Sequence, residues 1–264
     1  MSTEPTILDA IGATPLVKLS RIVPEGSASV YVKLEYMSPG GSMKDRIARQ
    51  IVLDAEASGA LKPGGTVVEL TSGNTGTGLA IVCRARGYQM VAVMSEGNSV
   101  ERRRMMRALG ARVEIVQQAG GSDPGKVSKE DLELVDDRAQ ELTRELGAFR
   151  ADQFNNPSNP RAHELGTAPE ILEQVGRHVD AVIAAVGTGG FFMGVARGLT
   201  AARDDTRCYA VEPASAAYLA GKRVTDTRHQ IQGIGYATKP GLWDEALVSG
   251  YIGVTNAEAT QTAR

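Results

Sequence analysis

The chain has 264 residues, 42% of them apolar, which is enough for one large domain or two smaller domains that share an interface. Its 29 basic and 31 acidic residues leave a formal charge of −2, so no global field draws it to nucleic acid or to an anionic membrane, and we expect neither as a partner. Its two cysteines, Cys83 and Cys208, lie in apolar stretches without a Cys-x-x-Cys spacing, which favours buried thiols and a reducing, cytoplasmic setting over disulfides or a metal site.

The amino terminus has no basic or apolar signal region, and no run of about eighteen apolar residues occurs anywhere, so we expect a chain that is neither secreted nor membrane-spanning. After it, short strands and helices alternate along the sequence. Strands are predicted over 16–19, 30–34, 66–70, 90–94, 113–116, 179–186 and 208–211, and helices over 7–11, 43–59, 79–86, 96–108, 131–146 and 192–202. This alternation predicts α/β layers with parallel sheets, whose ligands bind beyond the carboxyl ends of the strands.

Lys44 follows the end of an early strand. The segment 38–42 (Ser-Pro-Gly-Gly-Ser) makes a turn that cannot continue a strand, and its last residue, Ser42, has the chemistry of a helix N-cap. Lys44 then lies in the first helical turn, where the helix dipole and free N–H groups favour an anion such as a phosphate or a carboxylate. Two interpretations stay open from this segment alone: a nucleophilic amine that forms a Schiff base with pyridoxal phosphate (PLP), or a lysine whose charge pairs with a neighbour such as Asp45.

Two further strand ends carry polar, glycine-rich segments. The first is 71–78 (Thr-Ser-Gly-Asn-Thr-Gly-Thr-Gly), whose excess of hydroxyls and glycines over a plain turn predicts a loop that presents backbone N–H groups to an anion. The second is 187–191 (Gly-Thr-Gly-Gly-Phe), after strand 179–186, which is apolar nearly throughout, as a strand covered on both faces should be. A dinucleotide-binding fingerprint would place an acid that binds ribose near Glu212, but it would also need its third glycine at position 192, where this chain has phenylalanine. The loop therefore favours a site for a phosphate group alone.

Other polar segments favour structural interpretations. The helix over 96–108 carries Arg102 and three further arginines, but apolar residues alternate with them, which indicates a solvated face with an apolar back. The Gly- and Pro-rich segment 119–130 predicts an exposed loop that can move, and 152–160, with two prolines and three asparagines, predicts a rigid loop without regular structure. No metal site is predicted, because the three histidines lie far apart in sequence: His163, His178 and His229.

Five motifs occur in an order and at separations that are typical of one family. They are 39–46 (Pro-Gly-Gly-Ser-Met-Lys-Asp-Arg), 71–76 (Thr-Ser-Gly-Asn-Thr-Gly), 153–157 (Gln-Phe-Asn-Asn-Pro), 187–190 (Gly-Thr-Gly-Gly) and 232–235 (Gln-Gly-Ile-Gly). With them the chain resembles, from Ile7 to its last residue, the cysteine synthase (O-acetylserine sulfhydrylase) and cystathionine β-synthase family of fold-type II PLP enzymes, which share the tryptophan-synthase-β-like fold.

The resemblance implies an α/β fold of two three-layer αβα domains with mostly parallel sheets and PLP in the cleft between them. A smaller mobile domain would span 36–147, and a larger domain that binds the PLP phosphate would combine 1–35 with 148–264. The resemblance also implies a homodimer. Its reaction would be β-replacement on O-acetylserine or O-phosphoserine through an aminoacrylate, with sulfide as the default nucleophile and L-cysteine as the product.

The resemblance further implies roles for individual residues. Lys44 would carry the internal aldimine and, once freed by substrate, take the α-proton. Asn74 would hydrogen-bond the ring oxygen of PLP. The phosphate would be held by Gly187, Thr188, Gly189, Gly190 and the backbone amide of Phe191. The substrate, above all its carboxylate, would be bound by Thr71, Ser72, Thr75, Gln153 and Gly233.

The chain departs from the family's pattern at several places. Phe191 stands where members usually have a hydroxyl residue, Leu70 stands where they usually have proline, and 117–137 does not match their shorter, Gly-rich segment. Because that segment belongs to the part that closes over substrate, an amine or larger thiol nucleophile, or dehydratase-type β-elimination, stays open beside sulfide. The family also continues beyond position 264 into a Ser-Ser-Gly motif that contacts the pyridine nitrogen, so we expect a longer native chain. A non-catalytic paralogue that binds an amino acid or a partner is the remaining alternative.

Overall fold

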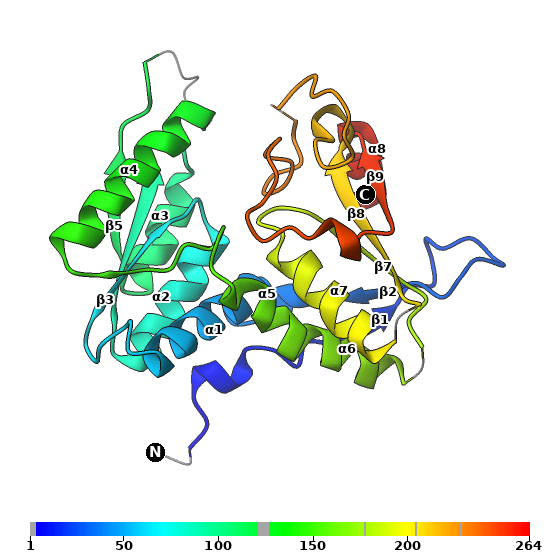
Figure 1. Cartoon of the computed structure of the whole chain (residues 1–264), viewed down its shortest axis with the longest axis horizontal. Coiled ribbons are helices and arrows are strands. Elements are labelled where there is room, and N and C mark those ends of the chain that lie inside the picture. Colours follow the sequence, from blue (N-terminus) through cyan, green and yellow to red (C-terminus); the bar gives the residue numbers. More distant parts are fainter. Residues whose placement is uncertain (1–3, 121–126, 177, 204, 228) are drawn as a thin grey trace. The chain divides into compact units, whose positions relative to one another are not determined.

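The computed structural model describes residues 4–120, 127–176, 178–203, 205–227 and 229–264. It falls into two compact units, unit 1 (Met1–Gln153) and unit 2 (Phe154–Arg264), whose elements are labelled in Figure 1. The loop predicted over 119–130 includes residues 121–126, which lie outside the described residues. The predicted division into 36–147 and 1–35 with 148–264 stays a prediction. No helix within the described residues is both long and apolar enough to cross a membrane.

Unit 1 is built on a parallel sheet of four strands in the order β5-β4-β3-β6. Its strands are β1 (Leu16–Lys18), β2 (Tyr31–Lys33), β3 (Thr66–Leu70), β4 (Gln89–Ser95), β5 (Arg112–Val116) and β6 (Phe149–Arg150), and β1 and β2 form a separate antiparallel pair. Its helices are α1 (Lys44–Ala57), α2 (Asn74–Arg86), α3 (Val100–Ala108) and α4 (Lys129–Glu145), with 3₁₀ turns at Ile7–Ala10 and Glu35–Met37. The predicted strands and their alternation with helices are confirmed.

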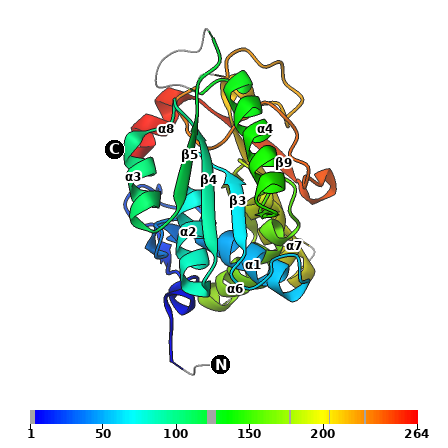
Figure 2. The ribbon, with the colours of Figure 1, turned by 90° about the vertical axis from the view of Figure 1, so that its left-hand side faces the viewer.

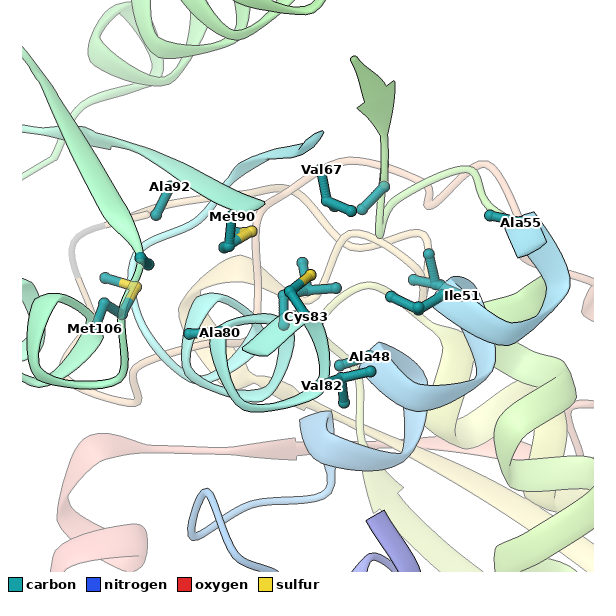
Figure 3. Packing of buried hydrophobic residues seen from close by; sticks show 14 of the residues in the cluster. Ala48, Ile51, Ala55, Val67, Ala80, Val82, Cys83, Met90, Ala92 and Met106 are labelled. Atoms are coloured by element: carbon teal, nitrogen blue, oxygen red, sulfur yellow. The ribbon is translucent and has the colours of Figure 1, made fainter. Parts of the chain in front are cut away.

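Helices cover both faces of this sheet, because successive strand residues point to opposite sides. Val67 packs with residues of α1, α2 and α3, and Figure 3 shows this cluster around Cys83. The next residue, Val68, packs on the other face against Val135 and Leu142 of α4. Figure 2 shows β5, β4 and β3 side by side with α4 on one side of them. The result is a three-layer αβα unit. Its core holds Cys83, one of the predicted buried thiols, and this burial raises the pKa of Cys83 to about 12.

A buried ion pair fixes the first turns of α1 to the segment before it. Arg46 donates from Nε and Nη2 to the two carboxylate oxygens of Glu35, each over 2.8 Å. The Thr14 hydroxyl also donates to Glu35, over 2.6 Å, and accepts from Arg46 over 3.1 Å. Only 2% of the Arg46 side chain and 13% of the Glu35 side chain are exposed. Because both charges are removed from water, their mutual geometry is tightly held.

Unit 2 contains a parallel sheet in the order β7-β8-β9. Its strands are β7 (Ala181–Ala185), β8 (Arg207–Pro213) and β9 (Gly250–Val254), and its helices are α5 (Ser158–Ala162), α6 (Ala168–Val175), α7 (Gly190–Ala202) and α8 (Asn256–Ala263), with 3₁₀ turns at Ala214–Ala216 and Glu245–Leu247. The sequence analysis did not predict α6, β9 and α8. Cys208, on β8, is buried as predicted.

Two predictions for unit 2 were wrong. Strand β7 is not covered on both faces: Val182 packs against α6 and α7, but Ile183 is 62% exposed. Burial within unit 2 therefore does not explain why the residues of β7 are apolar. The segment 152–160 is not irregular throughout, because α5 begins at Ser158 and contains Pro160. Proline is tolerated there since the N–H groups of a first helical turn have no partner within the helix.

A π-helical turn, His163–Thr167, joins α5 to α6, and α7 packs closely against this assembly. A Cβ atom at Gly194 would overlap the carbonyl oxygen of Pro160, and one at Gly198 would overlap the Cβ of Ala168. The His163 side chain is buried and shares a 2.9 Å hydrogen bond with the Thr167 hydroxyl across the turn. Small residues on α7 thus set how closely the helices approach.

The Arg46–Glu35 pair generates a stability prediction. We expect Arg46→Met to lower the free energy of unfolding by about 3 kcal/mol, because it leaves the Glu35 carboxylate buried without its counter-charge. Arg86→Met is the matched control: it removes an ion pair to Glu56 whose arginine is 42% exposed, and such pairs contribute less than about 1 kcal/mol. Urea unfolding followed by circular dichroism measures both, and equal losses would contradict the prediction.

Candidate active site

Lys44 is the first residue of α1, and the turn before it holds its backbone in place. The Lys44 N–H donates to the Ser42 hydroxyl over 3.2 Å, so Ser42 satisfies a first-turn amide as predicted, although the helix begins only at Lys44. Asp45 is buried and accepts from the Gly40 N–H over 2.5 Å. Burial, together with the nearby Glu35 charge, raises the pKa of Asp45 to about 6. Its carboxyl group therefore organises the turn rather than pairing with Lys44.

The Lys44 amine is poised to be neutral. Burial lowers its pKa from 10.5 to about 8, and no carboxylate of the described residues forms an ion pair that would restore the charged form. A substantial fraction of the amine is then unprotonated near pH 8. An unprotonated amine is the form that attacks carbonyl carbons, so the structure favours the nucleophilic interpretation of Lys44 over the ion-paired one.

The loop after β3 forms the second part of the candidate site. Helix α2 begins at Asn74, earlier than predicted, and its N-cap, Gly73, has no side chain that could bond the first-turn amides, so the N–H groups of Asn74 and Thr75 are open to an anion. The Thr71 hydroxyl accepts from the N–H groups of Gly73 over 3.2 Å and Gly76 over 2.9 Å. Thr71 and Thr75 are buried, whereas Ser72 and Asn74 are exposed. The loop therefore has an inner set of residues that shapes it and an outer set that faces solvent.

Gln153 ties the end of unit 1 to this loop. It accepts from the Thr75 hydroxyl over 2.6 Å and donates from Nε2 to the Leu70 carbonyl over 3.2 Å. Its backbone N–H donates to Glu69 over 3.4 Å. Two predicted substrate residues, Thr75 and Gln153, are thus hydrogen-bonded to each other at the carboxyl end of β3, while the third, Thr71, bonds the backbone of the same loop.

Glu69 is a residue of this site that the sequence analysis missed. It is 1% exposed and has one carboxylate oxygen without a hydrogen-bond partner. Burial raises the pKa of Glu69 to about 7, although Arg150, 3.8 Å away, opposes this rise. An acid in the otherwise apolar strand 66–70 is the sequence signal that could have found it.

Lys44 and the loop are brought together where α1 crosses α2. A Cβ atom at Gly78 would lie 3.0 Å from the Lys44 carbonyl oxygen and 3.1 Å from the Cβ of Ala48. Figure 3 shows the same contact between helices further along, with Ala48 and Ile51 beside Val82. Gly78 is one helical turn after Asn74, so the start of α1 lies against the start of α2.

Helix α3 also reaches this loop. The helix begins at Val100, later than predicted, because the Ser99 hydroxyl caps it by accepting from the Arg102 N–H over 3.3 Å. Arg102 is half-buried and donates from Nη1 to the Ser72 carbonyl over 3.0 Å. The prediction of a solvated face was therefore incomplete, because Arg102 on this face also contacts the loop. Sequence spacing places a residue on a helix face but does not show what that face meets.

The glycine loop of unit 2 forms a cradle without side chains. A Cβ atom at Gly187 would lie 2.5 Å from the Gly233 carbonyl oxygen, and one at Gly190 would overlap Asn159, whose amide donates to the Thr188 hydroxyl over 3.0 Å. Gly189 has φ of 83° and precedes α7, whose first turn has no side-chain cap. The missing Cβ atoms let the loop pack against Gly233 and Asn159, and the uncapped amides at the start of α7 fit a bound phosphate group.

Two side chains near this cradle have structural contacts. The Phe191 ring packs edge-on against His163, with 4.9 Å between the ring centroids. Both carboxylate oxygens of Glu212 accept backbone N–H groups, from Leu219 and Ala220, over 2.9 Å each. Glu212 thus holds its own loop in shape, which accounts for an acid at this strand end without a ribose.

Comparisons with known proteins agree with this geometry. The family model described as "Pyridoxal-phosphate dependent enzyme" matches residues 7–264. The O-ureido-L-serine synthase of Streptomyces lavendulae is 45% identical over 260 residues, which cover 98% of this chain and 76% of that protein. The cysteine synthase of Staphylococcus aureus is 42% identical over 259 residues, 98% of this chain and 80% of that protein. A crystal structure of O-ureido-L-serine synthase superposes with a TM-score of 0.87 at 44% identity, covering 100% of this chain and 79% of that one. The chain therefore belongs to the pyridoxal-phosphate-dependent enzymes, as a member similar to the cysteine synthases.

Proposed function

We propose that this enzyme catalyses β-replacement on an O-activated L-serine, either O-acetylserine or O-phosphoserine, with sulfide as nucleophile and L-cysteine as product. The observation that carries the proposal is the close approach at Gly78, where Lys44 lies against the helix that starts with the polar loop 71–76. It holds the backbone of Lys44 against the helix that follows this loop, an arrangement that suits proton transfer by the lysine at the α-carbon of an amino acid whose carboxylate the loop binds.

The proposed roles follow from the chemistry of each group. PLP, when bound, supplies an electron sink that stabilises negative charge on the α-carbon of an amino acid. Lys44 would hold PLP through its amine, by condensation with the aldehyde and loss of water, and the amine, once released, would take the proton from the substrate's α-carbon. Asn74, exposed at the start of α2, hydrogen-bonds the ring oxygen of PLP. Burial lowers the pKa of Lys44 to about 8, which gives the amine an unprotonated, basic fraction near that pH.

Anion binding is assigned to the two glycine-rich loops. The PLP phosphate is bound by the backbone of Gly187, Gly189 and Gly190, by Thr188, and by the backbone amide of Phe191, which offers no hydroxyl. The substrate carboxylate is bound by Thr71, Ser72, Thr75, Gln153 and the uncapped amides of α2, with Gly233 as a further substrate contact. The helix N-termini that follow both loops, whose N-cap glycines make no side-chain cap, support both assignments.

A second candidate differs only in the nucleophile. O-ureido-L-serine and L-cysteine both carry a substituent on the β-carbon of an alanine, and proteins named for each product are similar to this chain at 45% and 42% identity. Hydroxyurea, attacking through its oxygen, would give O-ureido-L-serine from the same donor. A homodimer in the cytoplasm completes the proposal.

A nucleophile panel tests the function. The purified enzyme with PLP is given O-acetylserine or O-phosphoserine together with sulfide, hydroxyurea, a larger thiol or an amine, and products are identified by mass spectrometry. We expect L-cysteine from sulfide. A product from hydroxyurea and none from sulfide would favour the second candidate, and no β-substituted product from any pair would refute β-replacement.

The pKa of Lys44 generates a prediction about cofactor capture. Since only the unprotonated amine attacks the PLP aldehyde, the rate at which the apoenzyme gains the visible absorbance of bound PLP should rise from pH 6.5 and level off above the Lys44 pKa of about 8. Borohydride reduction and peptide mass spectrometry should place the label on Lys44, and Lys44→Ala should show neither signal. Glu69→Gln should keep the profile. A rate that still climbs tenfold per pH unit at pH 9.5 would show an ordinary lysine.

The Thr75–Gln153 hydrogen bond generates a prediction about carboxylate binding. We expect Gln153→Met to raise KM for the donor about tenfold, because it removes the acceptor that orients the Thr75 hydroxyl. Gln153→Glu keeps an acceptor of the same shape but adds a negative charge, and we expect a further tenfold rise at pH 8. In both variants kcat should change less than KM. Equal KM values for the two variants would place the substrate carboxylate away from Gln153.

A further inference from the structure

We propose that Arg102 is a positioning residue for substrate: it locks the Ser72–Gly73 peptide so that the loop 71–76 presents a fixed surface to the substrate carboxylate. This inference rests on the proposed function, in which that loop binds the carboxylate. Neither the sequence motifs nor the assigned site residues include any part of α3.

The Ser72–Gly73 peptide is held at both ends. Its carbonyl accepts from Arg102 Nη1 over 3.0 Å, and its N–H donates to the Thr71 hydroxyl over 3.2 Å. Because a peptide unit is planar and its C=O and N–H point in opposite directions, two such bonds fix its rotation. Ser72 and Asn74, the exposed residues on either side of Gly73, are thereby fixed in direction as well.

The glycines of the loop are shaped to this helix. A Cβ atom at Gly73 would lie 3.0 Å from Arg102 Cδ and 3.1 Å from its Nε, and one at Gly76 would overlap Met106 Sδ. Arg102 and Met106 are four residues apart, so they share one face of α3. The helix therefore touches the loop at two glycines, and a side chain at either position would displace Arg102 or Met106.

Arg102 differs from the other arginines of its helix. Arg103 is half-buried and donates to the carbonyl groups of Glu96 and Asn98, within its own turn. Arg104 and Arg107 are exposed. Among the described parts of the chain, no carboxylate forms an ion pair with Arg102, so its positive charge is not neutralised beside a loop proposed to bind an anion. A hydrogen bond from a charged donor is also stronger than one from a neutral group.

The test compares Arg102→Met, Arg102→Gln and Arg102→Lys in the PLP-loaded enzyme, with Arg104→Met as the control on an exposed face of the same helix. We expect Arg102→Met to raise KM for O-acetylserine about tenfold with kcat within about twofold, because loop contacts to the carboxylate act equally in the ground and transition states. Arg102→Lys, which keeps a charged donor, should recover part of the loss. Arg104→Met should match wild type.

Two readouts do not depend on turnover. The dissociation constant of L-serine, measured from the change in PLP absorbance, should rise about tenfold in Arg102→Met. Amide hydrogen exchange over 72–76 in the ligand-free holoenzyme should be faster in Arg102→Met than in wild type or Arg104→Met, at an unchanged thermal midpoint. Wild-type exchange and L-serine affinity in Arg102→Met would overturn the inference. Altered exchange and affinity in an enzyme that forms no β-substituted product would uphold the inference and refute the proposed reaction.

Discussion

Helices α1 and α2 meet at Gly78, and the rest of unit 1 is arranged around that contact. With 3.0 Å between the Gly78 Cβ position and the Lys44 carbonyl oxygen, no side chain fits between the helices without displacing the start of α1. The Arg46–Glu35 pair holds the same turn, two residues after Lys44. A packing contact and a buried ion pair therefore fix the backbone of Lys44 with respect to the loop 71–76. A catalytic site needs its groups held in place in this way before substrate binds.

The same strand-end region suppresses the charges of its ionisable groups. Burial lowers the pKa of Lys44 to about 8 and raises the pKa values of Asp45 and Glu69 to about 6 and 7. All three shifts favour the neutral form, and all three come mainly from loss of water. Such clusters of shifted pKa values are typical of functional sites, and here they coincide with the end of β3 and the start of α1.

Much of this arrangement could be predicted from the sequence because local chemistry determined it. The strands of unit 1 other than β6 followed from short β-branched and apolar runs, and the two glycine-rich loops followed from glycines and hydroxyls placed after strands. Three features depended on tertiary contacts and could not be read locally. Arg102 looked like a solvated residue because the helix face was visible in the spacing but its neighbour, Ser72, was thirty residues away in the chain. Ile183 was predicted to be buried, because an apolar run does not show what covers it. The segment that contains α5 was predicted to be irregular because of its prolines and asparagines, but a first helical turn accepts proline.

The π-helical turn His163–Thr167 has a consequence for how unit 2 tolerates changes in chain length. A π turn contains one more residue than the α-helical turn it replaces. Each residue of an α-helix rotates the chain by about 100° about the helix axis. Deleting one residue there would leave a regular helix but would rotate all of α6, carrying Ala168 away from Gly198, where the two helices now touch. The extra residue thus determines which face of α6 packs against α7. Natural or engineered deletions in this stretch would therefore require a compensating insertion before Ala168.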